Sequence, residues 1–276
     1  MRGIFEDPFD RLPDTRNNTA GGAGRSPGIG AGHNHRVPAP GRGARVYRVR
    51  KLCAGGEFAT EFATIAQALA QWSVDKEGPG RPRVALIEIC DNATYDEAPH
   101  IVMAPDERLE LRAAHLAQPV LRLSYDDNGG PGKLRITGAG ASALTIDGLV
   151  VSGGAIEIEQ PSLEPALVPS LGQAGRVCVA LRHCTLVPGW DAQLCSPAPW
   201  RGKASIVVRA SDVDLQFDFS ITGPIRVARR GGLLALQVND SIVDAGHEAG
   251  LALADDAYGS AQARIGIARS TVIGVV

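Results

Sequence analysis

The stretch that decides the fold reads FATIAQALAQW from Phe62 to Trp72 and is followed by VALIEIC at residues 84–90. Phe62, Ile65, Leu69 and Trp72 lie at helical spacing, so the first part predicts a short amphipathic helix. The second part is apolar and β-branched, which favours a strand buried within a stack. A short amphipathic helix is the usual lid over the open apolar end of a parallel β-helix. We therefore expect this helix to cover the first coil of such a fold.

Short strands separated by turns continue the pattern. Residues 91–95, DNATY, supply turn chemistry after the first strand. Further short strands are predicted at Ile101–Met103, Leu109–Leu111 and Val120–Leu123. The predicted fold class is therefore all-β: a right-handed parallel β-helix, or solenoid, with a short N-terminal capping α-helix.

In this region the chain resembles the pectin-lyase-like superfamily, particularly the start of the pectin methylesterases and related β-helix proteins. The matching residues are Phe62–Ile65 with Ala68 and Leu69, Ile87–Ile89, Tyr95–Glu97, Leu109–Leu111 and Pro119–Leu121. The resemblance implies the fold. It includes no catalytic residue, and the methylesterase aspartate and arginine motifs do not follow, so it implies no mechanism.

A degenerate unit recurs through the second half of the chain, in which an apolar strand meets a small residue and then becomes apolar again. The small residues are Gly148, Cys184, Ser220, Ser241 and Ser270, which lie 36, 36, 21 and 29 positions apart. Such spacing fits coils of roughly 20–30 residues with loops inserted in some of them. We expect these small residues to be structural and to stack at equivalent positions inside the solenoid.

Composition and charge narrow the class of protein. The 276 residues are 44% hydrophobic but only 5% aromatic and include 33 glycines, which favours thin strands and frequent turns. A net charge of −2 gives no electrostatic reason to expect nucleic acid or an anionic membrane as a partner. No apolar stretch is long enough to cross a bilayer, and the first residues lack the apolar core of a signal peptide, so we expect a cytoplasmic location.

No cofactor is predicted. The five cysteines, Cys53, Cys90, Cys178, Cys184 and Cys195, form an odd set without the paired spacing of a zinc site, so reduced thiols are favoured. Glycine-rich residues 138–141 do not follow the strand, loop and helix order of a phosphate-binding motif.

The chain divides into two parts. Residues 1–44 form a Gly/Pro-rich arm without apolar periodicity, which we expect to be flexible or to act as a docking peptide. Residues 45–276 form the predicted β-helix, with inserted loops at Gln160–Gly175 and Pro188–Lys203. Trp190 and Trp200 in the second loop are candidate binding residues because they could stack on sugar rings, or they could pack the loop against the coils.

One set of residues resembles the polygalacturonase motifs: Asp240, His247, Asp255, Asp256 and Arg264. That resemblance implies two carboxylates facing one glycosidic bond, with a histidine and an arginine orienting the substrate. However, the histidine precedes the paired aspartates here, which is the reverse of the family order, and the lysine after the arginine is missing. Solvated turn residues are therefore the favoured interpretation.

A second set is a candidate calcium site, as in pectate lyases. Asp212, Asp214 and Asp218 alternate along a predicted strand and would share one face, where carboxylate oxygens could bind a hard cation. The intervening apolar residues are Val213, Leu215 and Phe217. Because these suit the core side of the same strand, the aspartates are more simply its solvent side.

Four segments are similar to a group of bacterial β-helix proteins that are encoded beside contractile, phage-tail-like injection particles: residues 144–153, 183–190, 223–227 and 240–245. This resemblance implies a non-enzymatic structural or binding component of such a particle, which is the leading functional hypothesis. The alternatives are a polysaccharide lyase or glycoside hydrolase acting on acidic glycans, and a non-catalytic carbohydrate-binding β-helix.

The C-terminal residues 271–276, TVIGVV, are apolar and lie within a predicted strand. A solenoid whose last coil is bare exposes apolar surface and unpaired strand groups. We therefore expect either a partner to cover this end, from another particle protein or a second copy, or the chain to be part of something longer. Surface glycans are a further possible partner.

Overall fold

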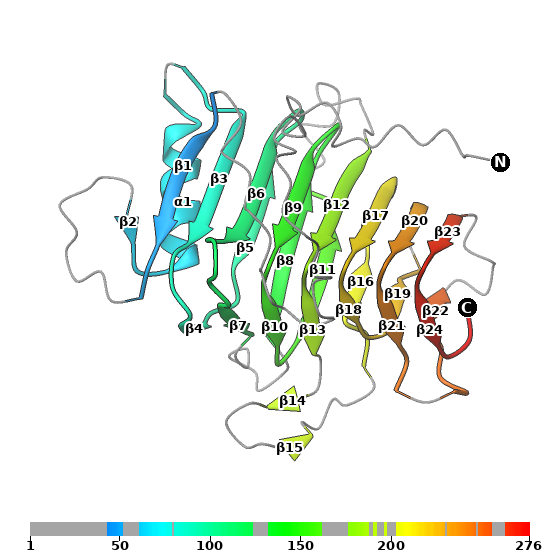
Figure 1. The fold of residues 1–276 in the computed structure, drawn as a ribbon. Helices are drawn as coiled ribbons and strands as arrows, with labels where there is room; N and C mark the ends of the chain where they lie inside the picture. Colours follow the sequence, from blue (N-terminus) through cyan, green and yellow to red (C-terminus); the bar gives the residue numbers. More distant parts are fainter. Residues whose placement is uncertain are drawn as a thin grey trace, which may run out of the picture.

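The computed structural model describes residues 43–51, 61–78, 80–123, 132–161, 176–187, 190–191, 196–197, 203–229, 231–246, 248–255 and 263–276. Within these residues the protein is mostly β, with three long parallel sheets and one short helix (Figure 1). Helix α1 lies at the β1 end of the sheets, and the C-terminus lies at the β23 end. The structure describes none of residues 1–42, so all of the predicted arm except residues 43 and 44 lies outside the described residues.

The largest sheet has nine strands. Its order is β2 (Glu61–Phe62), β1 (Arg45–Val49), β3 (Val84–Ile89), β6 (Arg108–Ala113), β9 (Ala143–Asp147), β12 (Val177–Arg182), β17 (Val213–Asp218), β20 (Leu233–Asn239) and β23 (Arg264–Ala268). Every neighbouring pair is parallel.

Two further parallel sheets complete the stack. The seven-stranded sheet contains β4 (Thr94–Asp96), β7 (Val120–Arg122), β10 (Val150–Ser152), β13 (Thr185–Val187), β18 (Ile221–Thr222), β21 (Ile242–Asp244) and β24 (Thr271–Ile273). The six-stranded sheet contains β5 (His100–Met103), β8 (Lys133–Gly138), β11 (Ala155–Glu159), β16 (Ile206–Val208), β19 (Ile225–Val227) and β22 (Leu253–Asp255).

The chain visits the three sheets in turn. β3 enters the nine-stranded sheet, β4 the seven-stranded sheet and β5 the six-stranded sheet, after which β6 returns beside β3. The same order repeats up to β23 and β24, so each coil lies against the one before it. This arrangement is consistent with the predicted parallel β-helix. The predicted strands are confirmed with small shifts at their ends.

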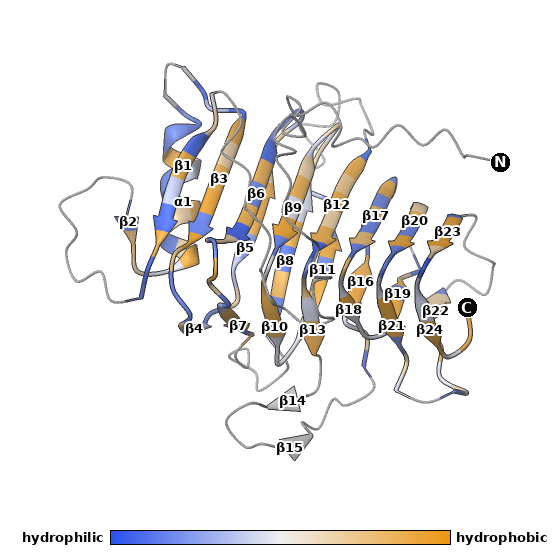
Figure 2. Ribbon diagram, viewed as in Figure 1, coloured by the Kyte–Doolittle hydropathy of each residue, from blue (hydrophilic) through white to orange (hydrophobic). Residues whose placement is uncertain are grey.

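The core lies between the sheets and is built from aligned rows of apolar side chains. Ile87, Leu111, Ile146, Leu181 and Phe217 are register partners on successive strands, and all five are fully buried. Burying one side chain of this size contributes roughly 1.5–3 kcal/mol of transfer free energy. Figure 2 shows apolar positions recurring along the strands of successive coils.

Helix α1 (Ile65–Asp75) covers the first coil and buries Ile65, Ala68, Leu69 and Trp72. The predicted cap is confirmed, but Phe62 lies in β2 and not in the helix. The helix begins at Ile65 because Thr64 is extended and its hydroxyl accepts a hydrogen bond from the Gln67 N–H, which is standard N-capping geometry.

The corner between the nine- and seven-stranded sheets has the same geometry in successive coils. Gly148, His183, Phe219, Asp240 and Arg269 all occupy the left-handed region, with φ between 48° and 77°. The first four of these residues donate their backbone N–H to the strand-end carbonyl of the next coil at 2.9–3.1 Å. We refer to these five residues as the corner residues.

The predicted alignment of the repeat was wrong in its first copy. Gly148 aligns with His183, and Leu149 aligns with Cys184. The glycine suits a backbone position with positive φ, where a Cβ is strained, and so it is not a member of the row of small interior residues. Size alone did not distinguish the two positions.

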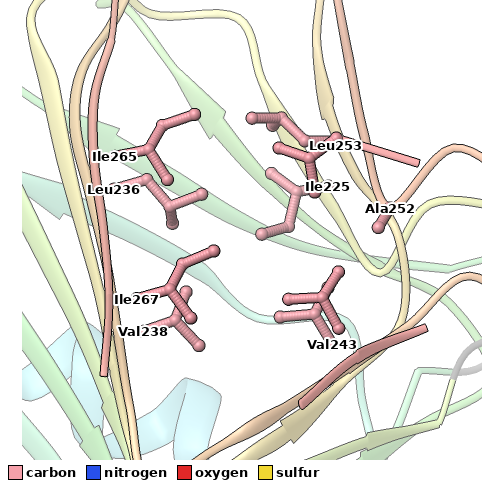
Figure 3. A pocket seen from close by; sticks show the side chains of 10 residues that line it. Ile225, Leu236, Val238, Val243, Ala252, Leu253, Ile265 and Ile267 are labelled. Carbon is pink, nitrogen blue, oxygen red and sulfur yellow. The ribbon is translucent and has the colours of Figure 1, made fainter. Parts of the chain in front are cut away.

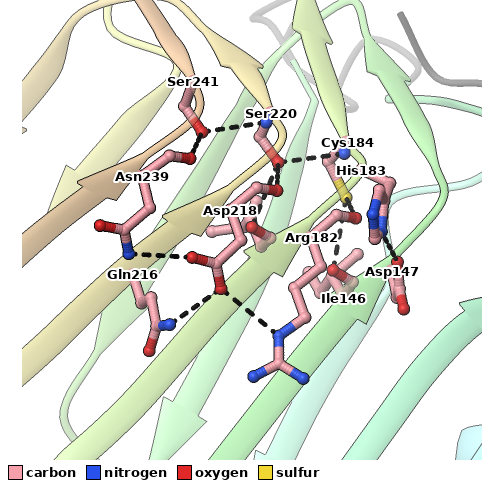
Figure 4. Close-up of polar contacts among 11 residues, drawn as sticks. Ile146, Asp147, Arg182, His183, Cys184, Gln216, Asp218, Ser220, Asn239 and Ser241 are labelled. Atoms are coloured by element: carbon pink, nitrogen blue, oxygen red, sulfur yellow. Dashed lines mark hydrogen bonds and ion pairs between the residues drawn. The ribbon is translucent and has the colours of Figure 1, made fainter. Parts of the chain in front are cut away.

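The other four small residues stack as expected. The N–H of Cys184 donates to Ser220 Oγ at 3.1 Å, and that of Ser220 donates to Ser241 Oγ at 3.0 Å (Figure 4). The N–H of Ser241 donates to Ser270 Oγ at 3.0 Å. The Ser241 hydroxyl donates in turn to the Asn239 carbonyl at 2.6 Å. The row is therefore a hydrogen-bonded ladder along the inner side of the corner, which we call the serine ladder.

The predicted inserted loops lie largely outside the described residues. Of the first loop the structure describes residues 160–161, and of the second it describes a short antiparallel pair, β14 (Trp190–Asp191) with β15 (Ser196–Pro197), and residue 203. Among the described residues, no helix combines the length and the apolar character needed to cross a bilayer.

Candidate functional site

The end of the stack formed by β22, β23 and β24 exposes apolar side chains that belong to the interior rows. In β20, Leu236 and Val238 are 4% and 1% exposed, whereas their register partners in β23, Ile265 and Ile267, are 42% and 46% exposed. Val276 at the same end is 60% exposed. The core therefore reaches the surface here.

These side chains line one apolar pocket (Figure 3). The lining residues are Ile225, Leu236, Val238, Val243, Ala252, Leu253, Ile265, Ile267, Val272 and Val276. They come from all three sheets of the last two coils. We call this surface the apolar end.

Backbone contacts shape the rim of the apolar end. The Val275 N–H donates to the Gly250 carbonyl at 2.7 Å, and the Ala252 N–H donates to the Val275 carbonyl at 2.8 Å. Gly274 allows the chain to pass this close to Gly250, because its φ of +127° suits glycine and an added Cβ would lie 2.6 Å from the Gly250 oxygen. Because β22, β23 and β24 are the last strands of their sheets in the described chain, their outer edges can accept a further strand.

The opposite end of the stack is closed. Tyr47 and Val49 of β1 point into the core and are fully buried, although β1 lies beside the last strand of its sheet. The Tyr47 hydroxyl donates to Asp75 Oδ2 at the end of α1, at 2.7 Å. That hydrogen bond is the main cause that lowers the pKa of Asp75. The two ends of the molecule thus differ in the exposure of equivalent core positions.

A row of alternating charge runs along the outer face of the nine-stranded sheet. The register partners in this row are Arg48, Glu88, Arg112, Asp147, Arg182, Asp218 and Asn239. Arg112 Nη2 lies 2.9 Å from Glu88 Oε1. Arg182 Nε lies 3.5 Å from Asp218 Oδ2 (Figure 4). Opposite charges therefore face each other across successive coils, which favours this register.

The row also contacts the corner residues. His183 Nδ1 lies 2.8 Å from Asp147 Oδ1, and the His183 ring stacks on Phe219 with centroids 5.3 Å apart. Asn239 Nδ2 donates to Asp218 Oδ1 at 3.0 Å. These groups satisfy one another, so the row acts as a lattice of structural contacts between coils.

The structure separates the described members of the polygalacturonase-like set. Asp240 is a corner residue whose two oxygens lie 2.6 Å from Arg269, and this hydrogen bonding lowers the pKa of Asp240. Arg264 begins β23, whereas Arg269 follows its other end, so Arg264 and Asp240 lie at opposite ends of the strand, about 16 Å apart along it. Asp255 ends β22 in a different sheet. His247 and Asp256 lie outside the described residues.

The three aspartates of the calcium hypothesis are also spread along their strand. Asp212 precedes β17 with a φ of 58°, and Asp214 and Asp218 stand about 13 Å apart on its outer face. Asp218 contacts Arg182, Gln216 and Asn239. In the part of the chain that the structure describes, no group of three or more His, Cys, Asp or Glu residues is arranged to hold a metal ion.

The intervening residues behave as predicted, because Val213, Leu215 and Phe217 are buried in the core. Asp214, however, is 7% exposed and does not lie on an open solvent side. Burial raises the pKa of the Asp214 carboxyl, while the charges of Arg176 and Arg264 act in the opposite direction.

Of the predicted binding residues, Trp190 lies in β14 and pairs with Pro197 through its backbone, while Trp200 lies outside the described residues. Cys90 and Cys184 are free thiols, and Cys178 is buried on β12. Burial raises the pKa of Cys184 to about 12, which suits its place in the serine ladder.

Sequence reasoning missed the charged row and the buried carboxylate of Asp214. The signal for the row was the recurrence of opposite charges at the strand ends, for example Asp147, Arg182 and Asp218. To recognise the row from the sequence, one must know which residues pair between coils of unequal length, and only the structure gives this register.

Comparison with known proteins adds no relative: no protein-family model, no curated protein and no solved structure matches this chain. The resemblances to the pectin-lyase-like superfamily and to particle-associated β-helix proteins therefore remain predictions from the sequence.

Proposed function

We propose that this chain is a non-enzymatic structural protein, built on a right-handed parallel β-helix, which joins a larger assembly through its apolar end. The observation that carries the proposal is the contrast between the two ends of the nine-stranded sheet. Core residues of β1 are fully buried beneath α1, whereas Ile265 and Ile267 of β23 are 42% and 46% exposed.

Contiguous exposed apolar surface of this kind is typical of protein interaction sites. Solenoids normally need a capping element at each end, and open strand edges favour pairing with another chain. An incoming protein could cover the apolar side chains and continue the strands at the same time. Assembly through this surface therefore offers both apolar burial and backbone hydrogen bonds.

We further propose that the assembly is a phage-tail-like contractile injection particle formed in the cytoplasm. Support for this step comes from the sequence resemblance of residues 144–153, 183–190, 223–227 and 240–245. The proposal predicts that genes beside the one for this chain encode tail-tube or sheath proteins. Neighbouring genes of unrelated kinds would contradict it.

The assembly proposal is tested by placing a charge on the apolar end. Ile267→Asp and Ile273→Asp should each weaken the wild-type assembly at least about tenfold in dissociation constant, because a carboxylate would have to be buried against apolar side chains. Analytical ultracentrifugation measures the assembly, and circular dichroism verifies that each variant is folded.

Val74→Asp is the matched control, because Val74 is an apolar residue 61% exposed on α1 at the closed end. It should leave the assembly unchanged. A wild-type protein that stays monomeric at high concentration, or an equal effect of Val74→Asp, would overturn the proposal.

The proposal that this protein is not an enzyme has a separate test. Polygalacturonate and alginate are incubated with the protein, with and without calcium, and reducing ends and unsaturated products are measured. We expect no product. Product formation that is abolished by His247→Ala, Asp255→Ala or Asp256→Ala would replace the structural role with a polysaccharide-active one.

A further inference from the structure

The outer edge of β23 presents backbone groups in a fixed alternation. The Ala268 carbonyl accepts a hydrogen bond from the Asp240 N–H at 3.0 Å, so the backbone groups of Ala268 point toward the preceding coil. Backbone groups alternate along a strand, so those of Gly266 point the same way, whereas those of Ile265 and Ile267 point toward the outer edge. β23 is the last strand of its sheet among the described residues.

The side chains of the same two residues point into the stack. Ile265 lies beside Leu236 and Ile267 beside Val238, on the core side of the sheet, and both isoleucines are exposed at the apolar end (Figure 3). Ile265 and Ile267 thus offer edge backbone groups and an apolar side chain together, with Gly266 midway between them.

We propose that the partner at the apolar end is a second copy of this chain, whose β23 runs antiparallel to the first around a two-fold axis at Gly266. This inference rests on the proposed assembly through the apolar end and names its partner. The axis places Ile265 opposite Ile267 of the second copy, and Ile267 opposite its Ile265. Each pair exchanges two backbone hydrogen bonds, and its two side chains lie together on the core side.

Other registers fit this edge less well. An axis at Ile267 would place the charged Arg269 opposite Ile265, beside the apolar side chains. An axis at Ile265 would place Ile267 opposite Ala263, which buries less apolar surface. An axis between two residues would bring edge backbone groups against groups that point away, so the hydrogen bonds would not form. The axis at Gly266 is the one that pairs both isoleucines with each other.

The charges at the edge are complementary in this arrangement. Arg264 is the single charged residue of β23 and lies opposite Ala268 of the second copy, so the two arginines stand about 13 Å apart along the strands. Ala268 is the register partner of Asn239, which follows Asp218 in the row of alternating charge. Arg264 of the second copy takes the next place in that row, and its positive charge follows the negative Asp218.

The two-fold axis also matches the other two sheets. Because it passes through the middle of β23, it exchanges these sheets between the copies, and β24 of one copy meets β22 of the other. Each of the two strands has three residues, so neither projects beyond its counterpart. All three strand edges of the apolar end are thus covered by a second apolar end.

The closed end of the stack is a poorer match for this edge. Helix α1 lies over the first coil there, and a helix that satisfies its own backbone groups cannot continue a sheet. The edge strand at that end, β2, has only two residues. Two copies therefore meet apolar end to apolar end, and such an isologous contact closes at two chains.

Disulfide trapping at the axis tests this arrangement. Cys53, Cys90 and Cys195 are replaced by serine in the full chain, and Gly266→Cys is added. A Cβ added at Gly266 meets nothing within 4 Å, so the cysteine fits. Across the axis the two Cα atoms at position 266 lie about 4.5 Å apart, which suits a disulfide. Ala268→Cys is the matched control, because the two residues at position 268 stand about 13 Å apart.

Gly266→Cys should form a disulfide between two chains at least about tenfold faster than Ala268→Cys at equal concentration. Arg264→Cys alone should also link slowly, whereas an equimolar mixture of Arg264→Cys and Ala268→Cys should link quickly, because these positions face each other. Adding Ile267→Asp should slow the Gly266→Cys reaction about tenfold. Sedimentation of the wild-type chain should show a species of two chains, and circular dichroism verifies that each variant is folded.

Equal rates for Gly266→Cys and Ala268→Cys would overturn the two-fold contact. If sedimentation then still shows an assembly that Ile267→Asp weakens, the proposed function stands and this partner and orientation are wrong. A chain that stays monomeric and forms no disulfide would overturn both. An assembly of the purified chain that grows beyond two copies through the apolar end would also overturn the closed dimer.

Discussion

Glu97 accepts hydrogen bonds from the backbone N–H groups of Ile65 and Ala66, both at 2.9 Å, through its two carboxylate oxygens. The Glu97 carboxylate thus lies at the N-terminus of α1, where N–H groups without a partner in the helix and the helix dipole favour a negative charge. This contact ties the cap to the stack.

Glu97→Ala should lower the free energy of unfolding by about 1–2 kcal/mol, because two helix N–H groups lose a charged acceptor. Urea unfolding followed by circular dichroism measures the change. Glu77→Ala removes an exposed glutamate after the other end of the helix and should have little effect. Equal effects of the two substitutions would show that Glu97 does not cap the helix.

Leu69→Asp should destabilise the protein by roughly 3 kcal/mol or more, because it places a carboxylate beneath α1 against the first coil. Ala70→Asp adds the same charge at the neighbouring exposed position and serves as its control. Thermal unfolding of the two variants gives the comparison. A stable Leu69→Asp protein would rule out the packing of α1 on the first coil.

Ser241→Ala should cost about 1–3 kcal/mol, because the buried Ser220 N–H then loses its acceptor. Ser241→Cys should cost less, since Cys184 already shows a thiol at an equivalent position of the serine ladder. Denaturant unfolding distinguishes the two. The ladder would be energetically unimportant if both variants matched the wild type.

The hydrogen bond from Tyr47 lowers the pKa of Asp75 below 3.8 in the folded protein. A lowered carboxyl pKa contributes stability that is present above the unfolded value and is lost as pH falls through the folded value. Tyr47→Phe should therefore raise the pKa of Asp75, measured by NMR titration, and should weaken the dependence of stability on pH below about 3.8. An unchanged Asp75 titration would contradict this assignment.

The sequence predicted the parts of the fold that depend on local pattern. Helical spacing located Leu69 and Trp72 in the cap, and runs of β-branched residues located β3. The register between coils could not be predicted, because coils of unequal length bring residues such as Arg182 and Asp218 together across 36 positions. Gly148 shows the same limit, since its role depends on a positive φ that composition does not reveal.

The candidate site, too, could be predicted from the sequence only in part. The apolar run near Val276 predicted an exposed end, and the structure describes such an end. The burial of Asp214 was not predicted, because alternation along β17 specifies which face a side chain occupies but not what lies over that face.

The corner residues have a consequence for how this molecule tolerates change. His183, Phe219, Asp240 and Arg269 keep one backbone geometry although the coils between them contain 36, 21 and 29 residues. Additional length is therefore accommodated outside this corner, at the other two turns of each coil, while strand register is maintained here. Segments of new length and chemistry can be grafted at those two turns without disturbing the stack, so the surface of this protein can diversify independently of its core.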